Sequence, residues 1–412
     1  SDLGRILNFT YYESIYSPMI TGRLVIEDTG GTIENEKGLL STIKDGMKIT
    51  GFEEVSFKIA TAFGDLNFRD YPLIVTGSPA TKDEPNRQTL ILNLVSKTEM
   101  ISSSKPLSRN YPESPISEAV EKILTKELKI TKDKLDIEKT QNQDKIKGNH
   151  CGALDVIQKM CKKSIPANGK DPGYFFFETQ DGFNFKSIDG LIKEGIKRFE
   201  DDLHYAYNHT YFYFGALVAN LEKDRNPNDF KVLLPPLVRR DEDQLQALRN
   251  GLYNVRIIIK NALTGEYKEE IKNLLSGSNL GEKQEKPMQV TDDVYFKTYA
   301  FHINPGEDDP GVSTNILNNP AEYVPQANMR YSLLHTQIVQ IQVPCNVQLK
   351  AGQVIRLLLE NITQSNKNDQ IYNELRSGFY MICHLSHTFT PKNSYTSLTL
   401  LRDTRELYTS KK

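Results

Sequence analysis

The chain has 412 residues, of which 38% are hydrophobic and 25% are charged, and its formal net charge is −2. One hydrophobic core rarely serves more than about 250–300 residues, so we expect several domains. The hydrophobic content excludes a disordered chain, and the near-neutral charge excludes a global field that would attract nucleic acid or anionic membranes.

The cysteines and the N-terminus indicate the type of cellular compartment in which the chain is made. Four cysteines without a repeated short spacing argue against a disulfide framework and a zinc cage, which favours a reducing compartment during synthesis. No run approaches the ~18 consecutive apolar residues of a transmembrane helix. The N-terminal SDLGRILNF lacks the basic region and apolar core of a signal peptide, so we expect neither membrane insertion nor secretion by this route. The cysteines are Cys151, Cys161, Cys345 and Cys383.

Residues 1–105 have the pattern of an all-β region. In PMITGRLVIEDTGG, the apolar Ile20, Leu24 and Ile26 alternate with polar residues before a Gly-Gly turn. The stretches EEVSFKIAT, YPLIVTG and TLILNLVS repeat this alternation, and we interpret each as one strand. Strands joined by short turns must bury a shared face, which predicts a sandwich or a closed barrel.

Residues 106–240 have the pattern of an α+β domain. Serine and proline accumulate at ISSSKPLSRNYPESP, and a helical pattern follows, with Ser114 or Ser117 as its cap. The stretch CGALDVIQKMCKK predicts a second helix. The stretch YFFFETQDGFNF predicts a hairpin, because its Asp-Gly pair accepts the positive φ of a tight turn.

The remaining residues predict β structure with an interruption. GLYNVRIIIKNALTGEYKEEI predicts two strands around Thr264-Gly265, within residues 241–276. Frequent glycine and proline over residues 277–331 predict an insertion or extended loop, in which VYFKTYAF is the only strand. Strand spacing returns over residues 332–408.

The final strand pair is GFYMICHLSHTF and SLTLLRD, joined by a PKNS turn. Regular alternation would place five apolar residues of the first strand on one face, and would place Leu398 and Leu400 together on one face of the second. The five residues of the first strand are Phe379, Met381, Cys383, Leu385 and Phe389.

Histidines are the first candidates for chemistry. His204 and His209 lie five apart beside Asp201 and Asp202, whereas two helical ligands of one metal usually lie four apart, so we favour a solvated polar segment over a metal site.

Two further histidine groups have structural interpretations. His384 and His387, three apart in a predicted strand, should lie on opposite faces. His150 and Cys151 are adjacent, which does not provide the geometry of a nucleophile and its base.

Sequence signatures of enzymes are absent. The chain has no G-x-S-x-G elbow, no P-loop and no G-x-G-x-x-G fingerprint. A glycosidase pair cannot be selected among 53 acidic residues. The aromatic run at residues 205–214 lacks interleaved basic residues, so we favour packing over stacking on bases or sugars. We therefore predict no enzyme and no catalytic, cofactor-binding or metal-binding residue.

The order of these segments resembles the central baseplate hub protein of contractile-tailed bacteriophages. SIYSPMITGRLVIEDTGG with LLSTIKDGMKITGFEEVSFKI is similar to the opening of that family's first barrel. SPISEAVEKIL and the later CGALDVIQKMCKK to YFFFETQDGFNF are similar to its intervening domain. VPCNVQLKAGQVIRLLLE with GFYMICHLSHTFTPKNSYTSLTLLRDT is similar to the closing strands of its second barrel.

The resemblance implies an α+β, mainly β fold. The expected parts are a tail-tube-like antiparallel β-barrel at residues 1–105, an α+β domain at 106–240, a second such barrel at 241–276 and 332–408, and an irregular insertion at 277–331. It also implies a homotrimeric ring, because a trimer of duplicated barrels presents threefold and near-sixfold faces together.

The implied partners are those of a phage tail. They are a tail spike or tail lysozyme protein, the tail tube protein, other baseplate proteins and the tape measure protein. Phage DNA would pass through the ring during ejection without specific binding. The location would be the tail baseplate of the virion, after synthesis in the host cytoplasm.

Three alternatives remain open from the sequence. One is the tip of a type VI secretion or other contractile injection system, whose spike we expect to be a separate polypeptide because the chain ends at ELYTSKK. Another is a tail-associated cell-wall hydrolase that uses acids within residues 106–240. The third is a carbohydrate-binding β protein.

Overall fold

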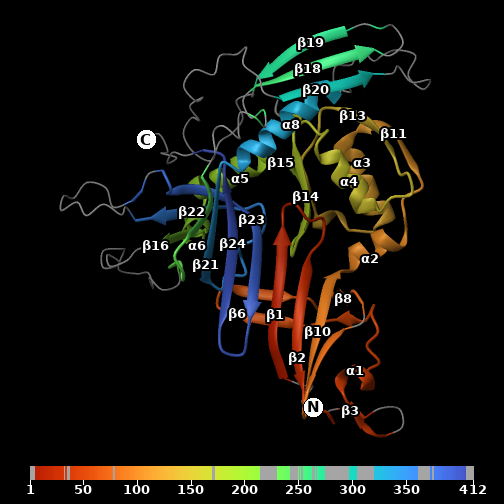
Figure 1. Ribbon diagram of the computed structural model, residues 1–412, viewed down its shortest axis with the longest axis vertical. Helices are drawn as coiled ribbons and strands as arrows, with labels where there is room; N and C mark the ends of the chain where they lie inside the picture. Colours follow the sequence, from red (N-terminus) through yellow and green to blue (C-terminus); the bar gives the residue numbers. More distant parts are fainter. Residues whose placement is uncertain are drawn as a thin grey trace, which may run out of the picture.

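The computed structural model confirms a mainly β chain with some helices, since 47% of the described residues lie in strands and 23% lie in helices (Figure 1). Among the residues described, no helix is long and apolar enough to span a membrane. The structure describes residues 5–31, 33–34, 38–77, 79–168, 172–213, 230–241, 249, 251, 254–261, 265, 267–273, 297–303, 320–360, 372–373 and 375–404.

A single 12-stranded sheet dominates the molecule, and its main path runs β17-β21-β24-β23-β1-β2-β10-β8-β5, with β9 on β10, β22 on β23 and β16 on β22. Regular alternation of apolar and polar residues predicts β2, β5, β8, β10, β21, β22, β23 and β24, whereas β1, β9, β16 and β17 were not predicted from the sequence. Their bounds are β1 Arg5–Ser14, β2 Thr21–Asp28, β5 Glu54–Val55, β8 Leu73–Val75, β9 Ala80–Glu84, β10 Arg87–Ser96, β16 Thr210–Tyr213, β17 Leu237–Asp241, β21 Gln337–Pro344, β22 Val354–Leu359, β23 Gly378–Phe389 and β24 Ser394–Arg402.

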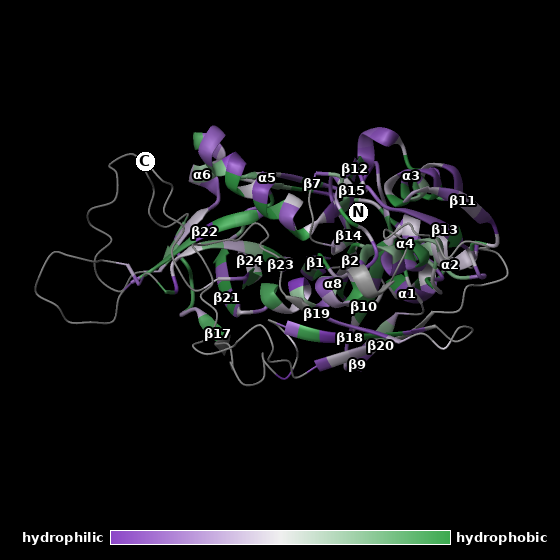
Figure 2. Cartoon of the chain, turned by 90° about the horizontal axis from the view of Figure 1, so that it is seen from above, coloured by the Kyte–Doolittle hydropathy of each residue, from purple (hydrophilic) through white to green (hydrophobic). Residues whose placement is uncertain are grey.

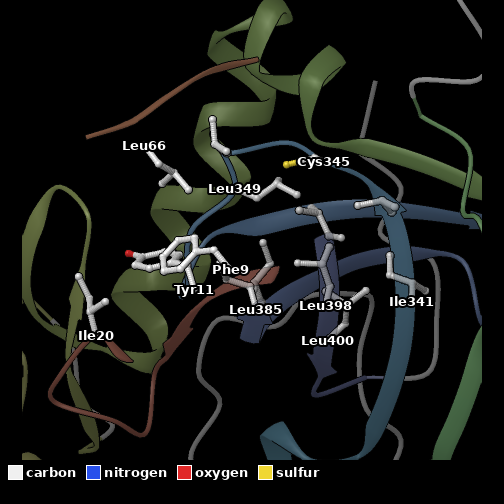
Figure 3. Packing of buried hydrophobic residues seen from close by; sticks show 14 of the residues in the cluster. Phe9, Tyr11, Ile20, Leu66, Ile341, Cys345, Leu349, Leu385, Leu398 and Leu400 are labelled. Atoms are coloured by element: carbon white, nitrogen blue, oxygen red, sulfur yellow. The ribbon is translucent and has the colours of Figure 1, made fainter. Parts of the chain in front are cut away.

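The strands of the two ends of the chain meet at β1. This strand pairs antiparallel with β2 on one side and with β23 on the other, so that Tyr12 lies opposite both Thr21 and Ser386. One hydrophobic core spans the junction, from Phe9 and Tyr11 to Leu398 (Figure 3). The described pairings thus make one continuous sheet, and the two closed barrels stay a prediction. The mostly polar β9 lies at the periphery (Figure 2).

One predicted strand is broken in two. The residues EEVSFKIAT form β5 and then β6 (Lys58–Thr61), which pairs with β7 (Gly64–Asn67) in a separate two-stranded sheet. Only β5 joins the large sheet, through β8. The prediction of one continuous strand was wrong, because alternation of side chains does not reveal which partner strand each segment meets.

The last strand pair contains a β-bulge, so the prediction that five apolar residues of β23 share one face was wrong. The register of β23 shifts at Cys383, since Ile382 lies opposite Leu400 and His384 lies opposite Thr399. An extra residue exchanges the two faces of a strand. Phe379, Met381 and Cys383 therefore pack in a different core cluster from Leu385, whereas Leu398 and Leu400 share one face as predicted.

The middle of the chain forms an α+β layer with its own core. Both predicted helices and the hairpin are confirmed. Neither Ser114 nor Ser117 caps the first helix. Pro115 occupies the cap position, and Ser117 instead exchanges hydrogen bonds with Thr140. The elements are α2 Lys97–Ser104, β11 Asn110–Pro115, α3 Ile116–Lys122 with a π-helical turn Ile123–Glu127, a 3₁₀ turn Lys132–Lys134, β12 Leu135–Ile137, β13 Gln143–Lys147, α4 Ala153–Cys161, β14 Tyr174–Thr179, β15 Gly182–Ser187, α5 Ile188–Asp201 and α6 Leu203–Asn208.

A small sheet and one helix lie at the far end of the molecule (Figure 1). Strands β18 (Asn254–Asn261), β19 (Tyr267–Asn273) and β20 (Lys297–Ile303) pair in the order β19-β18-β20, and α8 (Pro320–Leu334) packs against them. The strand predicted at VYFKTYAF is confirmed by β20.

The helix α8 contradicts the prediction of no long regular element in residues 277–331. It has 15 residues and contains Pro325. Tyr323, Ala327 and Met329 are buried on different sides of the helix, and this packing outweighs the missing backbone donor of the proline. Thr264 and most of residues 277–319 lie outside the described part of the chain. A last two-stranded pair near the N-terminus joins β3 Ile33–Glu34 to β4 Leu40–Ser41, beside the short helix α1 Ile43–Gly46.

Candidate assembly surface

Rows of polar side chains cross the face of the large sheet opposite its core. The pairing register aligns Gln342, Ser397, Ser386, Tyr12 and Thr21 across five neighbouring strands. Each is exposed or half-buried, whereas the next residues along these strands are buried in the core. Strand alternation thus produces a continuous hydrogen-bonding face across the junction of the two ends of the chain.

A second row runs beside the first. Gln340, Thr399, His384 and Ser14 are aligned in the same register, and the Gln340 side-chain amide donates to the Thr399 hydroxyl at 3.3 Å. Partial burial and the neighbouring His335 lower the pKa of His384, so the imidazole is neutral at pH 7. Hydroxyl, amide and neutral imidazole groups therefore form these two rows, which we call the polar rows.

The two edges of the large sheet expose apolar side chains. At the β17 edge, the leucine patch consists of Leu233, Leu234 and Leu237, which are 49%, 57% and 54% exposed. Leu234 and Leu237 border an open groove whose other lining residues include Tyr12, Gln340 and His384 of the polar rows. The patch is therefore continuous with the polar face.

The opposite edge has an exposed apolar segment of its own. Residues 39–52 lead into β5, the last strand of the main path at that edge. Leu40, Met47 and Phe52 in this segment are 69%, 52% and 76% exposed. Phe52 lies at this edge, because its backbone N–H donates to the Val75 carbonyl of β8, whereas Leu40 belongs to the separate β3–β4 pair. Exposed large apolar side chains at a sheet edge are typical of a surface that another protein covers.

His204 and His209 do not converge on a metal. His209 is buried, where its ring contacts the Tyr205 carbonyl at 2.9 Å and the Gln353 side-chain oxygen at 3.2 Å. Burial lowers the pKa of His209 to about 4. His204 is exposed, and the Asp202 carboxylate caps the helix α6. Nowhere in the described residues do three or more metal-ligating side chains gather.

In each of the other two groups, the two side chains also lie in different surroundings. His387 is buried, contacts the Thr396 hydroxyl at 2.8 Å and stacks on Tyr11, whereas His384 is exposed on the opposite face. His150 contacts the Ser108 hydroxyl at 3.0 Å, while the Cys151 thiol lies 3.5 Å from a lysine ammonium.

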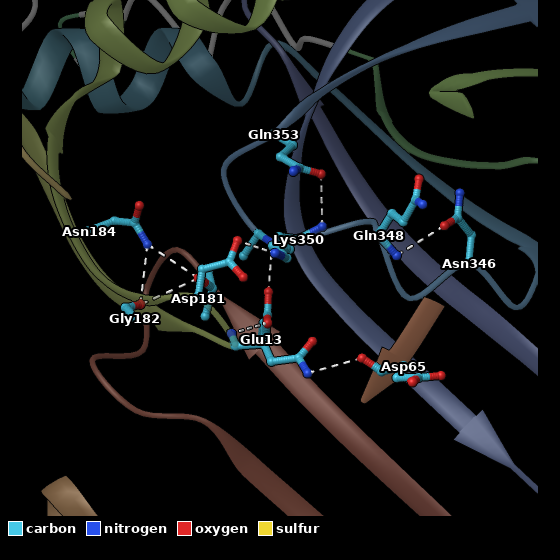
Figure 4. A network of polar contacts seen from close by, with 12 residues as sticks. Glu13, Asp65, Asp181, Gly182, Asn184, Asn346, Gln348, Lys350 and Gln353 are labelled. Atoms are coloured by element: carbon cyan, nitrogen blue, oxygen red, sulfur yellow. Dashed lines mark hydrogen bonds and ion pairs between the residues drawn. The ribbon is translucent and has the colours of Figure 1, made fainter. Parts of the chain in front are cut away.

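Sequence reasoning missed two buried carboxylates, those of Glu13 and Glu178, and Figure 4 shows the surroundings of Glu13. The Glu13 carboxylate accepts hydrogen bonds from the Tyr11 hydroxyl at 2.5 Å, from the Gln180 backbone at 3.0 Å and from the Ala351 backbone at 2.9 Å. The Glu178 carboxylate of β14 accepts a hydrogen bond from the Ile20 backbone N–H at 3.0 Å. The two acids thus join the first strands, the hairpin and the loop before β22.

The position of Glu13 in the sequence could have indicated that its carboxylate is buried. It shares the parity of Phe9, Tyr11 and Ile15 in β1, all of which are buried. An acid at a core position of a strand requires buried partners, but the sequence does not show which segments supply them.

A second buried ion network joins α8 to the rest of the molecule. The Arg330 guanidinium contacts the Asp189 carboxylate at 2.7 Å and the Asp403 carboxylate at 2.9 Å, and all three side chains are almost completely buried. Arg330 thereby links α8, α5 and the end of β24.

Comparison with known proteins shows where this fold occurs. No family model matches the sequence, and no curated protein matches it. The tail protein from Neisseria meningitidis MC58 superposes with a TM-score of 0.54 at 9% identity, over 97% of this chain and 93% of that one. The chain shares its fold with this tail protein.

Two further solved structures resemble this chain to different degrees. The 43 kDa tail protein of prophage MuSo2 from Shewanella oneidensis matches with a TM-score of 0.50 at 8% identity, over 98% of this chain and 95% of that one. The c3393 protein of E. coli, a component of the type VI secretion system, matches with a TM-score of 0.43 at 9% identity, over 99% of this chain and 76% of that one. At these identities the likeness concerns the fold.

Proposed function

We propose that the chain is a structural, non-enzymatic hub of a phage tail baseplate, located in the virion. In this proposal a homotrimeric ring joins a sixfold tail tube to a threefold cell-puncturing spike. The fold shared with the Neisseria meningitidis tail protein supports the proposal, and the observation that carries it is the continuous sheet with apolar residues at both edges.

The strand order supports the proposed symmetry. The sheet contains two successive strand groups, β17-β21-β24-β23 and β1-β2-β10-β8, which meet at the β1–β23 pair. Three copies would supply six such groups around one axis. The β17 edge and the β5 edge differ, so contacts between copies would be heterologous, and heterologous contacts form a ring when the rotation closes. The proposed division is a first barrel at 1–105, an α+β domain at 106–240, a second barrel at 241–276 and 332–408, and an insertion at 277–331. The sheet topology modifies this division, because β18 and β19 of residues 241–276 pair with β20 of the insertion in the small sheet, and β16 and β17 join the large sheet.

The polar rows suit the inner wall of such a ring. Each phosphate that a cation neutralises adds salt-dependent affinity for DNA, so a wall of uncharged hydroxyl and amide groups would let DNA slide. Water and the wall can still exchange hydrogen bonds along the whole face. The partners would be the tail tube protein, a spike or tail lysozyme protein, the tape measure protein and other baseplate proteins.

Mass measurement and electron microscopy test this proposal. Light scattering of the purified chain should give three times the chain mass, and negative-stain images should show a threefold ring with a central hole. A monomer that persists both alone and after addition of the tail tube and spike proteins would overturn the proposal. Clearing of bacterial cell walls by the purified chain would favour the hydrolase instead.

A further inference from the structure

An apolar cavity of about 300 Å³ lies between the first strands and the α+β layer. Its walls come from β8, α2, the segment after the π-helical turn and the β14–β15 hairpin. This volume is at the lower end of the range for ligand pockets, which suits a single ring better than an extended ligand. The buried apolar residues that line it are Ile20, Phe68, Leu73, Leu128 and Phe183.

Three buried polar side chains interrupt the apolar lining, and one of them, Thr179, already donates its hydroxyl to the Gly182 carbonyl. Glu178 is 8% exposed and Ser96 is 6% exposed. The Glu178 carboxylate accepts from the Ile20 backbone and, with about four acceptor positions, has capacity for more donors. The Ser96 hydroxyl lies near enough to help lower the pKa of Glu178. It has no hydrogen-bond partner of acceptable geometry among the described residues, and such a buried group calls for one.

The mouth of the cavity is positively charged. Tyr71, Lys97 and Lys129 are exposed lining residues, and the Lys134 ammonium lies 5.0 Å from the centre of the Tyr71 ring. Lys97 is paired with Glu54 at 2.6 Å. Glu178 is the sole acid among the residues that line the cavity. A positive rim around an apolar interior favours an apolar group that has acidic neighbours.

We propose that this cavity binds the tyrosine side chain of a partner protein in which acidic residues flank that tyrosine. The ring would fill the apolar interior, while the phenol hydroxyl would donate to Glu178 and accept from the Ser96 hydroxyl. A phenol can do both, whereas an indole N–H only donates and a phenyl ring does neither. A buried tyrosine anchor is typical of binding hot spots. The proposal is independent of the trimer.

Short peptides test the proposal directly on the full chain. The probes are acetyl-Asp-Tyr-Asp-amide, the matched phenylalanine peptide and acetyl-Lys-Tyr-Lys-amide, titrated by calorimetry and ligand-observed NMR. Loss of two buried hydrogen bonds should make the phenylalanine peptide bind about tenfold more weakly. The lysine-flanked peptide should also bind more weakly, with a difference that salt reduces. Free p-cresol should compete with the tyrosine peptide, and toluene should compete less.

Variants distinguish the cavity from other sites. Ser96→Ala removes one of the two hydrogen bonds and Glu178→Gln replaces a charged acceptor with a weaker neutral one, so each should reduce the difference in affinity between the tyrosine and phenylalanine peptides, and Ile101→Trp should block both peptides. Ser103→Ala is the matched control, because Ser103 is exposed on the same helix α2 and does not line the cavity. Thermal unfolding checks that each variant is folded. Equal binding of the tyrosine and phenylalanine peptides, no binding of either, or unchanged binding by all three cavity variants would overturn the proposal.

Discussion

At the scale of single residues, the buried acids Glu13 and Glu178 make this protein sensitive to pH. Burial is the main cause that raises the pKa of Glu13 to about 6 and that of Glu178 to about 7. The groups that face them are Tyr11, Asp181 and Lys350 around Glu13, and Glu99 near Glu178. The folded protein therefore binds protons at these two sites more tightly than the unfolded chain does.

The sign of the pH effect follows from these raised pKa values. The stabilisation is complete below the ordinary carboxyl pKa and is lost as pH rises through about 6 and about 7. We expect the melting temperature to fall between pH 5 and pH 8 by more in the wild type than in the Glu13→Gln/Glu178→Gln variant. Differential scanning calorimetry across this range measures the difference, and identical pH profiles would contradict the assignment.

Among the residues that join α8 to the rest of the molecule, Arg330 should be the one whose substitution reduces stability the most. Its guanidinium is buried between two carboxylates, so Arg330→Met would leave both acids buried without their cation. Breaking such a network costs about 3–5 kcal/mol. We expect a clear loss of melting temperature, measured by calorimetry.

A matched control separates burial from charge pairing. Arg87 also contacts two carboxylates, those of Glu84 and Glu27, but it is 55% exposed. Exposed pairs contribute little, so Arg87→Met should leave the melting temperature nearly unchanged. Equal effects of the two substitutions would show that burial does not govern the Arg330 network.

At the scale of elements, the β14–β15 hairpin depends on the glycine of its turn. Gly182 has a φ of +136°, and a Cβ there would lie 2.1 Å from the Lys134 carbonyl oxygen of the neighbouring segment. We expect Gly182→Ala to destabilise the protein by more than the ~1 kcal/mol cost of the left-handed region alone. The parallel contact of β12 with β15 should be lost as well, which hydrogen exchange measures.

Gly265 provides the matched control for this turn. It also has a positive φ, of +72°, but no atom of the described residues lies within 4 Å of an added Cβ. Gly265→Ala should therefore cost only the conformational strain, about 1 kcal/mol. If both substitutions reduce stability equally, the close approach at Gly182 has no effect of its own.

At the scale of the whole molecule, the leucine patch should control assembly. In the proposed ring, Leu234 and Leu237 at the β17 edge of one copy lie against the β5 edge of the next. The double variant Leu234→Glu/Leu237→Glu would bury two unpaired charges in that contact, so we expect it to stay monomeric under conditions in which the wild type is a trimer. Light scattering measures the difference.

The control for assembly is Tyr267→Glu on β19. Tyr267 is 58% exposed, as the patch leucines are, but it belongs to the separate small sheet. This variant should assemble like the wild type. A trimer of the leucine variant, or a monomer of the Tyr267 variant, would show that the contact between copies lies elsewhere. Circular dichroism confirms that both variants are folded.

The sequence by itself determined the local elements whose signal is periodic. The hairpin at residues 174–187, the helices that begin at Ile116 and Ala153, and most strands of the large sheet follow from side-chain alternation and turn residues. These features depend on neighbours within a few positions, so one chain segment contains all the information needed to predict them.

Only the tertiary structure decided how the elements meet. The bulge at Cys383, the division of EEVSFKIAT between two sheets and the helix α8 with its internal Pro325 each depend on a partner segment that lies far away in sequence. The same holds for Glu13, whose partners come from the hairpin and from the loop before β22. Burial and pairing between distant segments determine the stability of these features, and local sequence patterns do not contain that information.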